Sequence, residues 1–260
     1  MSLPLAGRRI VVTRPAGQAA GLARLIREAG GEPVLFPALE ILPPSDPAAL
    51  AAVLARLEQF DLAIFISRNA VDWGLAALGR AWPVQVRVAA VGAGTARALA
   101  ERGIGGVIAP QGPQPDSEAL LARPELADMR AARVLIFRGE GGREVLRESL
   151  VARGAEVEYA ECYRRARSRT EATALAAAWA RGEVDAATVN SAAALENLCA
   201  LIGEAAVRAA RATPLFVPHP RVAQAAADLG FARILVAGPS DDEMRDRLVA
   251  YFAAQSFAPR

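Results

Sequence analysis

Short apolar runs alternate along the chain with longer stretches in which apolar residues recur every three or four positions. An apolar run without polar alternation predicts a strand buried on both faces, and helical recurrence predicts an amphipathic helix. Strands are expected at 10–13, 33–36, 62–66, 87–91, 106–109, 134–137, 186–189, 214–217 and 232–236. Helices are expected at 19–28, 70–78, 95–102, 118–121, 146–154, 192–201, 221–229 and 241–252. Two more helices are expected to end near 57 and 180, behind caps at Ser45 or Asp46 and at Thr170 or Ser168. This alternation implies parallel sheets with helices on both faces.

The second half of the chain repeats the pattern of the first at a spacing of 124 residues. The matched pairs include Arg9 and Arg133, Gly17 and Gly141, Leu22 and Leu146, Gly30 and Gly154, Asp61 and Asp185, Ser67 and Ser191, and Gly79 and Gly203. One structural unit therefore occurs twice, which predicts two doubly wound α/β domains.

Polar or glycine-rich turns follow six of the predicted strands, at 14–15, 67–69, 92–95, 138–142, 190–191 and 218–221. In doubly wound sheets, ligands bind beyond the carboxyl ends of the strands. These turns are therefore expected to line one cleft between two facing domains.

The residue types present exclude several chemistries. All 30 cationic side chains are arginine, which excludes a lysine Schiff base, the usual pyridoxal enzyme and a Walker-type phosphate loop. Arginine suits bidentate binding of carboxylate or phosphate, although codon bias explains this composition equally well. His219 is the single histidine, so a histidine-rich metal site is impossible and a Ser-His-Asp triad would have to use it. Cys162 and Cys199 set no disulfide framework, and each is expected to be a buried, inert thiol.

Length and charge suggest a cytoplasmic protein. The 260 residues are 53% apolar, yet no run approaches the length of a membrane span and residues 1–9 lack a signal-peptide core. A net charge of +2 does not argue for nucleic acid. We expect a soluble protein that binds neither membrane nor nucleic acid.

Two glycine-rich turns are candidate ligand sites. The first, Gly92 to Arg97, follows a strand as a dinucleotide fingerprint does, but Arg97 occupies the third glycine position and no acid ends a later strand. Contacts through its amides and Thr95 are favoured over a plain strand-to-helix turn or a nucleotide site. The second, 138–143 (RGEGGR), is either an anion-binding corner or a tight turn with solvated arginines.

Six motifs occur together in an order and spacing that resemble the uroporphyrinogen-III synthase family. They are VTRP at 12–15, FISRNAV at 65–71, VGAGTARAL at 91–99, SEALL at 117–121, FRGEGGR at 137–143 and CYRR at 162–165. The resemblance extends from Gly7 to Phe252.

The resemblance implies a fold of two flavodoxin-like α/β domains joined by a two-stranded connector. One domain would be discontinuous, 1–35 plus 166–260, and the other would be an inserted domain, 43–158. The connector would comprise 36–42 and 159–165.

The resemblance also implies an activity. Members of the family close the linear tetrapyrrole hydroxymethylbilane into uroporphyrinogen III, with inversion of ring D and loss of water, and they use no metal or cofactor. The enzyme would fold the substrate and direct the attack, with modest acid assistance. A monomer is expected, to which the preceding pathway enzyme hands its product.

Site residues are carried over position by position. Tyr163 aligns with the family tyrosine proposed to help the hydroxyl depart. The expected substrate-binding residues are Arg14, Ser67, Asn69, Gly92, Thr95, Arg138, Gly139, Gly141, Gly142, Ser191, His219 and Arg221. Pro218–Arg221 and Asn190 depart from the threonine or serine turns common in the family.

Two other function classes stay open on the sequence alone. The first is a two-domain nucleotide-binding α/β enzyme that uses Gly92–Thr95, and the second is a non-catalytic two-domain receptor. Tight nucleotide binding would favour the first, and ligand binding without turnover would favour the second.

Overall fold

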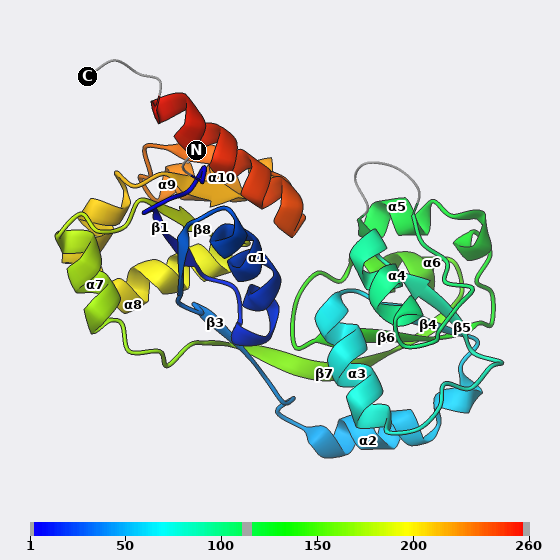
Figure 1. Cartoon of the computed structure of the whole chain (residues 1–260). Coiled ribbons are helices and arrows are strands. Elements are labelled where there is room, and N and C mark those ends of the chain that lie inside the picture. The colour runs from blue at the N-terminus through cyan, green and yellow to red at the C-terminus, as the bar shows by residue number, and fades with distance from the viewer. Residues whose placement is uncertain (1–2, 111–115, 257–260) are drawn as a thin grey trace. The chain divides into compact units, whose positions relative to one another are not determined.

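The computed structural model describes residues 3–110 and 116–256, and the chain divides in it into two compact α/β units. Unit 1 comprises Met1–Glu40 and Ala166–Arg260, and unit 2 comprises Ile41–Arg165. Each unit is built around its own five-stranded sheet (Figure 1). The two parallel-sheet α/β units confirm the predicted fold class.

In unit 1 the sheet order is β10-β9-β8-β1-β2, and all neighbouring strands are parallel. The strands are β1 (Arg9–Val12), β2 (Glu32–Leu35), β8 (Ala186–Thr188), β9 (Leu215–Val217) and β10 (Ile234–Val236). Counted within the unit, this is the 2-1-3-4-5 order of flavodoxin-like sheets. The helices are α1 (Ala16–Glu28), α7 (Thr173–Ala180), α8 (Ala192–Ala210), α9 (Pro220–Asp228) and α10 (Asp241–Ser256).

Strand β1 is buried on both faces of this sheet, because successive side chains of a strand point to opposite sides. Ile10 and Val12 pack with residues of α1 and α10, whereas Val11 packs with residues of α7, α8 and α9. Solvent reaches none of the three side chains. This double burial explains the uninterrupted apolar run in the sequence.

In unit 2 the sheet order is β3-β7-β6-β4-β5, with β5, β4, β6 and β7 parallel. The strands are β3 (Leu39–Leu42), β4 (Leu62–Phe65), β5 (Arg87–Ala90), β6 (Arg133–Gly139) and β7 (Glu156–Arg167). The helices are α2 (Pro47–Ala55), α3 (Arg68–Leu78), α4 (Ala93–Ala100), α5 (Ser117–Leu121) and α6 (Val145–Ala152). Along β6, Leu135 and Phe137 pack with α2, α3 and α4, while Val134 and Ile136 pack with α5 and α6.

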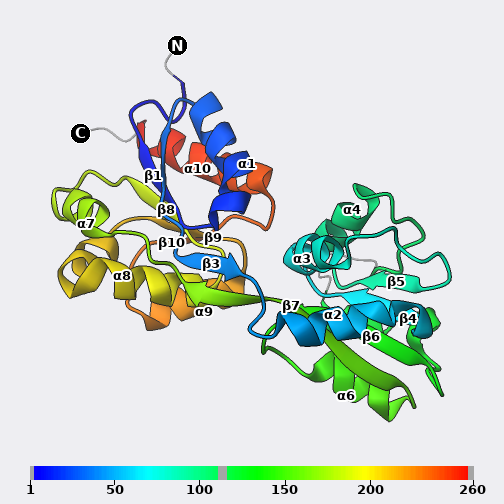
Figure 2. The same ribbon diagram turned by 90° about the horizontal axis from the view of Figure 1, so that it is seen from below.

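Both segments that carry the chain from one unit to the other are strands. The division between units falls at Glu40/Ile41 within β3 and at Arg165/Ala166 within β7, the long strand visible in Figure 2. Beyond the end of β7, the hydroxyl of Ser168 and the amide of Arg169 each donate to the Glu40 carboxylate at 3.0 Å. These bonds, the Arg169 amide foremost, lower the pKa of Glu40.

Three predicted elements differ from the structure. Residues 106–109 do not form a strand, since only one isolated bridge joins Ile108 to Ala89. Helix α7 begins at Thr173 without a side-chain cap, because the Ser168 hydroxyl bonds Glu40 and Thr170 instead. Element α8 extends to Ala210, but Gly203 at φ 77° is not helical, so a helix ends close to the expected position 201 and the helical segment after Gly203 is the part that was not predicted.

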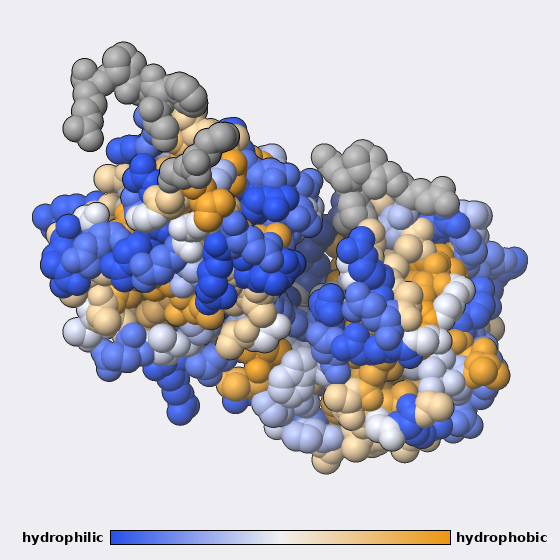
Figure 3. Space-filling view, viewed as in Figure 1, coloured by the Kyte–Doolittle hydropathy of each residue, from blue (hydrophilic) through white to orange (hydrophobic). Residues whose placement is uncertain are grey.

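The face seen in Figure 3 is largely hydrophilic, with apolar residues interspersed. Among the described residues, the large apolar side chains that are well exposed are Leu3, Leu35, Val84, Val151 and Val236, and Val84 is the most exposed, at 98%. Within the described ranges, every helix is too short or too polar to serve as a membrane span.

Candidate active site

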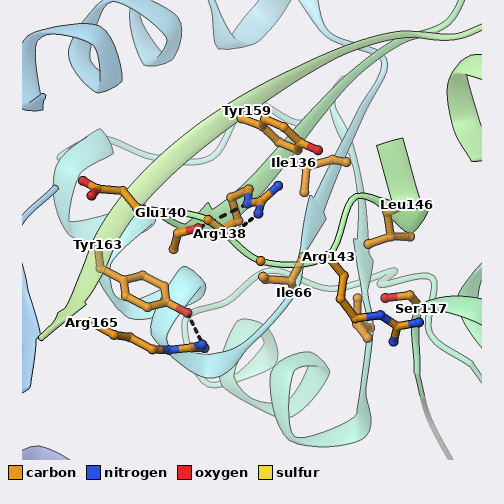
Figure 4. Close-up of a pocket in the computed structure, with 14 residues that line it drawn as sticks. Ile66, Ser117, Ile136, Arg138, Glu140, Arg143, Leu146, Tyr159, Tyr163 and Arg165 are labelled. Carbon is orange, nitrogen blue, oxygen red and sulfur yellow. Dashed lines mark hydrogen bonds between the residues drawn. The ribbon is translucent and has the colours of Figure 1, made fainter. Parts of the chain in front are cut away.

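A pocket of about 290 Å³ lies in unit 2, where the strands of its sheet end (Figure 4). It is lined by Ile66, Val91, Ser117, Ile136, Arg138, Gly139, Glu140, Gly141, Gly142, Arg143, Leu146, Tyr159, Tyr163 and Arg165. Ile66 and Val91 directly follow β4 and β5, and the residues from 139 to 143 follow or end β6. The pocket therefore occupies the position at which parallel α/β sheets bind ligands.

Tyr163 forms part of the pocket wall from strand β7, although solvent reaches none of its side chain. Its hydroxyl lies 3.1 Å from the Ser67 hydroxyl, and the Arg165 guanidinium donates to it at 3.3 Å (dashed in Figure 4). The Arg165 guanidinium carbon lies 5.8 Å from the centre of the tyrosine ring. The phenol is thus held within a small polar cluster.

Gly139 makes room for this tyrosine. A Cβ at position 139 would lie 2.6 Å from Cε2 of Tyr163, closer than real side-chain contacts allow. A shift in the register between β6 and β7 next to Arg138 sets Gly139 opposite Tyr163. Such irregularities re-aim side chains beside functional sites.

The turn after β6 requires glycine for its backbone conformation as well. Gly141 and Gly142 have φ values of 70° and 105°, in the left-handed region that disfavours other residues. Arg143 follows them, is exposed, and forms an ion pair with Glu118. The turn thus brings main-chain groups and one cationic side chain to the pocket.

The side chain of Arg138 stabilises this turn through contacts with several of its groups. Its side chain is 4% exposed and forms an ion pair with Glu144 at 2.9 Å. The guanidinium also donates to the carbonyls of Gly139, at 3.2 Å, and of Gly141. The structure therefore places Arg138 in contacts within the turn, while one edge of it faces the pocket.

Tyr159 completes this arrangement. The Arg138 guanidinium carbon lies 4.3 Å from the centre of its ring, and its hydroxyl donates to Glu144. The bond from Tyr159, followed by that from Arg138, lowers the pKa of Glu144. Burial, with a smaller part from the bond to Glu144, raises the pKa of Tyr159 to about 12. At neutral pH the tyrosine is therefore a neutral donor and the glutamate a carboxylate.

The remaining predicted site residues of unit 2 lie near the strand ends but do not line this pocket. Ser67 caps α3 by accepting from the Ala70 amide at 3.1 Å, and Asn69 lies half-buried in the first turn of the same helix. Gly92 is the N-cap residue of α4, and Thr95 is buried in its first turn. Of the predicted site in unit 2, the pocket brings together Arg138, Gly139, Gly141, Gly142 and Tyr163.

Four predicted site residues lie in unit 1, each at a strand-to-helix turn. Ser191 caps α8 through the Ala194 amide at 3.2 Å, and His219 caps α9 by accepting the Arg221 amide on Nδ1 at 3.2 Å. Arg14 forms an ion pair with Asp241. Two buried polar atoms of these turns, Arg14 Nε and Asn190 Oδ1, have no hydrogen-bond partner among the described residues.

Glu140 and Arg143 line the pocket as part of the turn 138–143 that the sequence offered as an anion-binding corner, whereas Ser117, Tyr159 and Arg165 line it without having been predicted as site residues. One signal could have identified Arg165, since residues two apart in a strand share a face and Arg165 follows Tyr163 at that spacing. Ser117 comes from the start of α5, and no sequence pattern places it beside β6. Over the described residues, no three His, Cys, Asp or Glu side chains are grouped as a metal ion would require.

Comparisons with known proteins agree with this architecture. The family model described as uroporphyrinogen-III synthase HemD matches residues 20–244. The uroporphyrinogen-III synthases of Salmonella typhimurium and Escherichia coli are 36% and 35% identical to the chain, over 90% of its length and 96% of theirs.

Among solved structures, a mutant uroporphyrinogen III synthase from Thermus thermophilus aligns with a TM-score of 0.65 at 21% identity, covering 96% of this chain and 100% of that one. A uroporphyrinogen-III synthetase from Helicobacter pylori aligns with a TM-score of 0.59 at 14% identity, covering 94% and 99%. At these identities the structural likeness establishes the fold alone, and the family rests on the sequence matches. The chain belongs to the uroporphyrinogen-III synthase family, which is a family of enzymes.

Proposed function

We propose that this chain closes hydroxymethylbilane into uroporphyrinogen III, inverting ring D and releasing water. Family membership supports this reaction over a nucleotide-binding enzyme or a non-catalytic receptor. The structural observation that carries the proposal is one pocket that combines a tyrosine hydroxyl, a glycine-rich turn and two exposed arginines.

The pocket suits a substrate that carries carboxylates. Arg143 and Arg165 present guanidinium groups that bind carboxylates in bidentate fashion. Main-chain amides of the turn at Gly139, Gly141 and Gly142 add uncharged donors, as turns before helices do for other anions. We assign these groups to binding and folding the substrate.

Tyr163 is the proposed acid. Departure of the substrate hydroxyl leaves a cation delocalised over the terminal pyrrole, and a proton from Tyr163 would let that hydroxyl leave as water. Tyr163→Phe removes one oxygen at a fully buried site and should reduce kcat by about tenfold or more. An unchanged kcat would remove the tyrosine from the mechanism.

We extend the proposed binding surface to the other turns predicted from the sequence. Asn69, Gly92 and Thr95 in unit 2 would contact substrate, whereas the hydroxyl of Ser67, which the sequence also placed in the binding set, lies 3.1 Å from that of Tyr163. In unit 1 the proposed contacts are Arg14, Ser191, His219 and Arg221. Substitution of Arg221, which is exposed, tests this extension most cleanly, because KM should rise without a loss of stability.

We also propose the cellular setting. The chain would work in the cytoplasm as a monomer without a cofactor or a nucleic acid or membrane partner, and it would receive hydroxymethylbilane from the preceding enzyme of the pathway. Light scattering of the purified protein tests the monomer, and a coupled assay with that enzyme tests direct transfer.

The decisive experiment is analysis of the product isomer. Purified protein is supplied with enzymatically made hydroxymethylbilane, and the products are oxidised and separated by chromatography. Isomer III should form well above the rate of the spontaneous reaction. Isomer I alone, at the rate of a blank without protein, would overturn the proposed function.

A further inference from the structure

Among the described residues, the Tyr163 hydroxyl is hydrogen-bonded to two side chains. Ser67 Oγ, at the N-cap of α3, lies 3.1 Å away, and the Arg165 guanidinium on β7 donates at 3.3 Å. We propose that Ser67 is a positioning residue, which directs the Tyr163 proton toward the reacting hydroxyl of the substrate. This inference rests on the role of Tyr163 in the proposed function.

The number of hydrogen atoms available limits how this cluster can be bonded. A phenol oxygen can accept hydrogen bonds as well as donate one, whereas a guanidinium can only donate. Arg165 therefore occupies one acceptor position of Tyr163. Ser67 Oγ already accepts the Ala70 amide at 3.1 Å, as the cap of α3.

The hydroxyl proton of Ser67 is consequently free to occupy the second acceptor position of Tyr163. In this arrangement every donor named has an acceptor except the Tyr163 hydroxyl itself, which is left for a ligand in the pocket. The opposite arrangement, with Tyr163 donating to Ser67, would remove the acid proton from the reaction. We assign the first arrangement to the reactive state.

The same bonds stabilise the tyrosine after it has given up its proton. The proton moves from Tyr163 Oη to the substrate hydroxyl, the carbon–oxygen bond breaks with its electron pair on oxygen, and water leaves. The phenolate keeps two donors, one from Ser67 and one from the cationic Arg165. Ring closure releases one proton from the substrate, which restores the phenol, so the balance of the reaction is the loss of one water.

The test compares Ser67→Ala with Ser67→Thr in steady-state kinetics with hydroxymethylbilane. Alanine should reduce kcat by about tenfold, as expected for one hydrogen bond to a reacting group, and change KM by less than about twofold. Threonine keeps both the hydroxyl and the capping function, so it should restore most of the rate.

Two further variants separate positioning from structure. Adding Ser67→Ala to Tyr163→Phe should cause no further loss of kcat, because the hydroxyl that Ser67 directs is gone. In unit 1, the Glu243 amide donates to the hydroxyl of Ser240, which caps a helix as Ser67 does. Ser240→Ala removes this bond and should lower the melting temperature while leaving kcat unchanged.

Each alternative outcome is distinct. A Ser67→Ala variant with unchanged kcat, or the same fall in kcat in the Tyr163→Phe background, would overturn the inference while the proposed function stands. A rise in KM alone would make Ser67 a direct substrate ligand and would also overturn it. Wild-type protein that forms only isomer I would overturn the proposed function, and this inference with it.

Discussion

The carboxylate of Asp185 accepts a hydrogen bond from the main-chain amide of Arg9 at 2.8 Å. The sequence repeat relates this pair to a second one, in which Asp61 accepts from the amide of Arg133, also at 2.8 Å. In both units, an aspartate of one copy thus fixes the first residue of a strand contributed by the other copy. Each unit therefore depends on both halves of the chain.

These bonds predict unequal losses of stability. Asp185→Ala removes the bond to Arg9 and an ion pair with Arg8 at 2.8 Å, so the free energy of unfolding should fall by about 2 kcal/mol. Asp61 is exposed, so Asp61→Ala should cost about 1 kcal/mol. Urea denaturation measures both changes, and Asp185→Asn, which keeps an acceptor oxygen, serves as the control. An equal loss from the asparagine variant would show that the bond to the Arg9 amide is not the cause.

The Arg138–Glu144 pair predicts a pH-dependent stability. The lowered pKa of Glu144 means that its carboxylate stabilises the fold when ionised. The contribution is complete above the ordinary glutamate pKa of about 4.5 and is lost as the pH falls through the lowered pKa of the folded protein. Glu144→Gln should therefore lower the melting temperature near neutral pH, and its difference from wild type should shrink in acid.

Glu148→Gln is the matched control for this pH series, since Glu148 is an exposed glutamate of α6, the helix whose N-cap residue is Glu144. Calorimetry from neutral pH down to about pH 3 compares the melting temperatures of the two variants with that of wild type. Parallel curves for the two variants would exclude a specific contribution of the Arg138–Glu144–Tyr159 contacts.

Gly139 predicts a loss of activity from the addition of one methyl group. In Gly139→Ala the new Cβ would meet the Tyr163 ring at 2.6 Å, so the ring or β6 must move and the phenol would lose its alignment with Ser67. We expect an overpacking cost of about 1–3 kcal/mol and a fall in kcat of about tenfold.

Gly74→Ala controls for overpacking alone. A Cβ there would lie 2.6 Å from Cδ1 of Phe137 in the same core, but Gly74 does not line the pocket. Its helical position adds a gain in propensity of about 1 kcal/mol, which offsets part of the clash. The melting temperature of Gly74→Ala should fall, while its kcat stays within about twofold of the wild-type value. A loss of kcat equal to that of Gly139→Ala would show that the core and the pocket cannot be perturbed separately.

The fold could be predicted because its central strands are buried on both faces. Val134 to Phe137 send alternate side chains into two cores, and such a strand appears as an unbroken apolar run. The sequence repeat also showed that Ser67 and Ser191 occupy equivalent positions, and in the structure each caps a helix, Ser67 capping α3 and Ser191 capping α8. The segment 106–109 has the same apolar appearance but makes only one bridge, because composition does not specify a pairing partner.

The contacts inside the candidate site were harder to predict from the sequence than the fold. The motif RGEGGR shows an arginine beside glycines, but it cannot show that Glu144 and Tyr159 enclose that arginine. Nor can it show the register shift that sets Gly139 against Tyr163. These contacts join β6, β7 and α6, and they depend on packing that local patterns do not encode.

Alkylation of the Cys162 thiol should report on the opening of unit 2. It is buried next to Tyr163, donates to the Ala160 carbonyl at 3.0 Å, and burial raises its pKa to about 12. In a Cys199→Ser variant, which removes the half-buried second thiol, Cys162 should resist alkylation at pH 8 until the protein unfolds. Because the pKa of Cys162 is raised in the folded protein, folding favours the neutral thiol. This contribution of the thiol to stability is complete below the ordinary pKa of about 9 and declines as the pH rises toward 12.

The rate of this alkylation should respond to where the protein is destabilised. Asp61 belongs to unit 2 with Cys162, whereas Asp185 belongs to unit 1. If the units open separately, Asp61→Ala should accelerate labelling of Cys162 more than Asp185→Ala does, even though its total cost in stability is smaller. If the labelling rate instead rises with the total loss of stability, the two units unfold together. Rapid labelling of Cys162 in the native Cys199→Ser protein, without either aspartate substitution, would mean that β7 beside Tyr163 is not a packed strand.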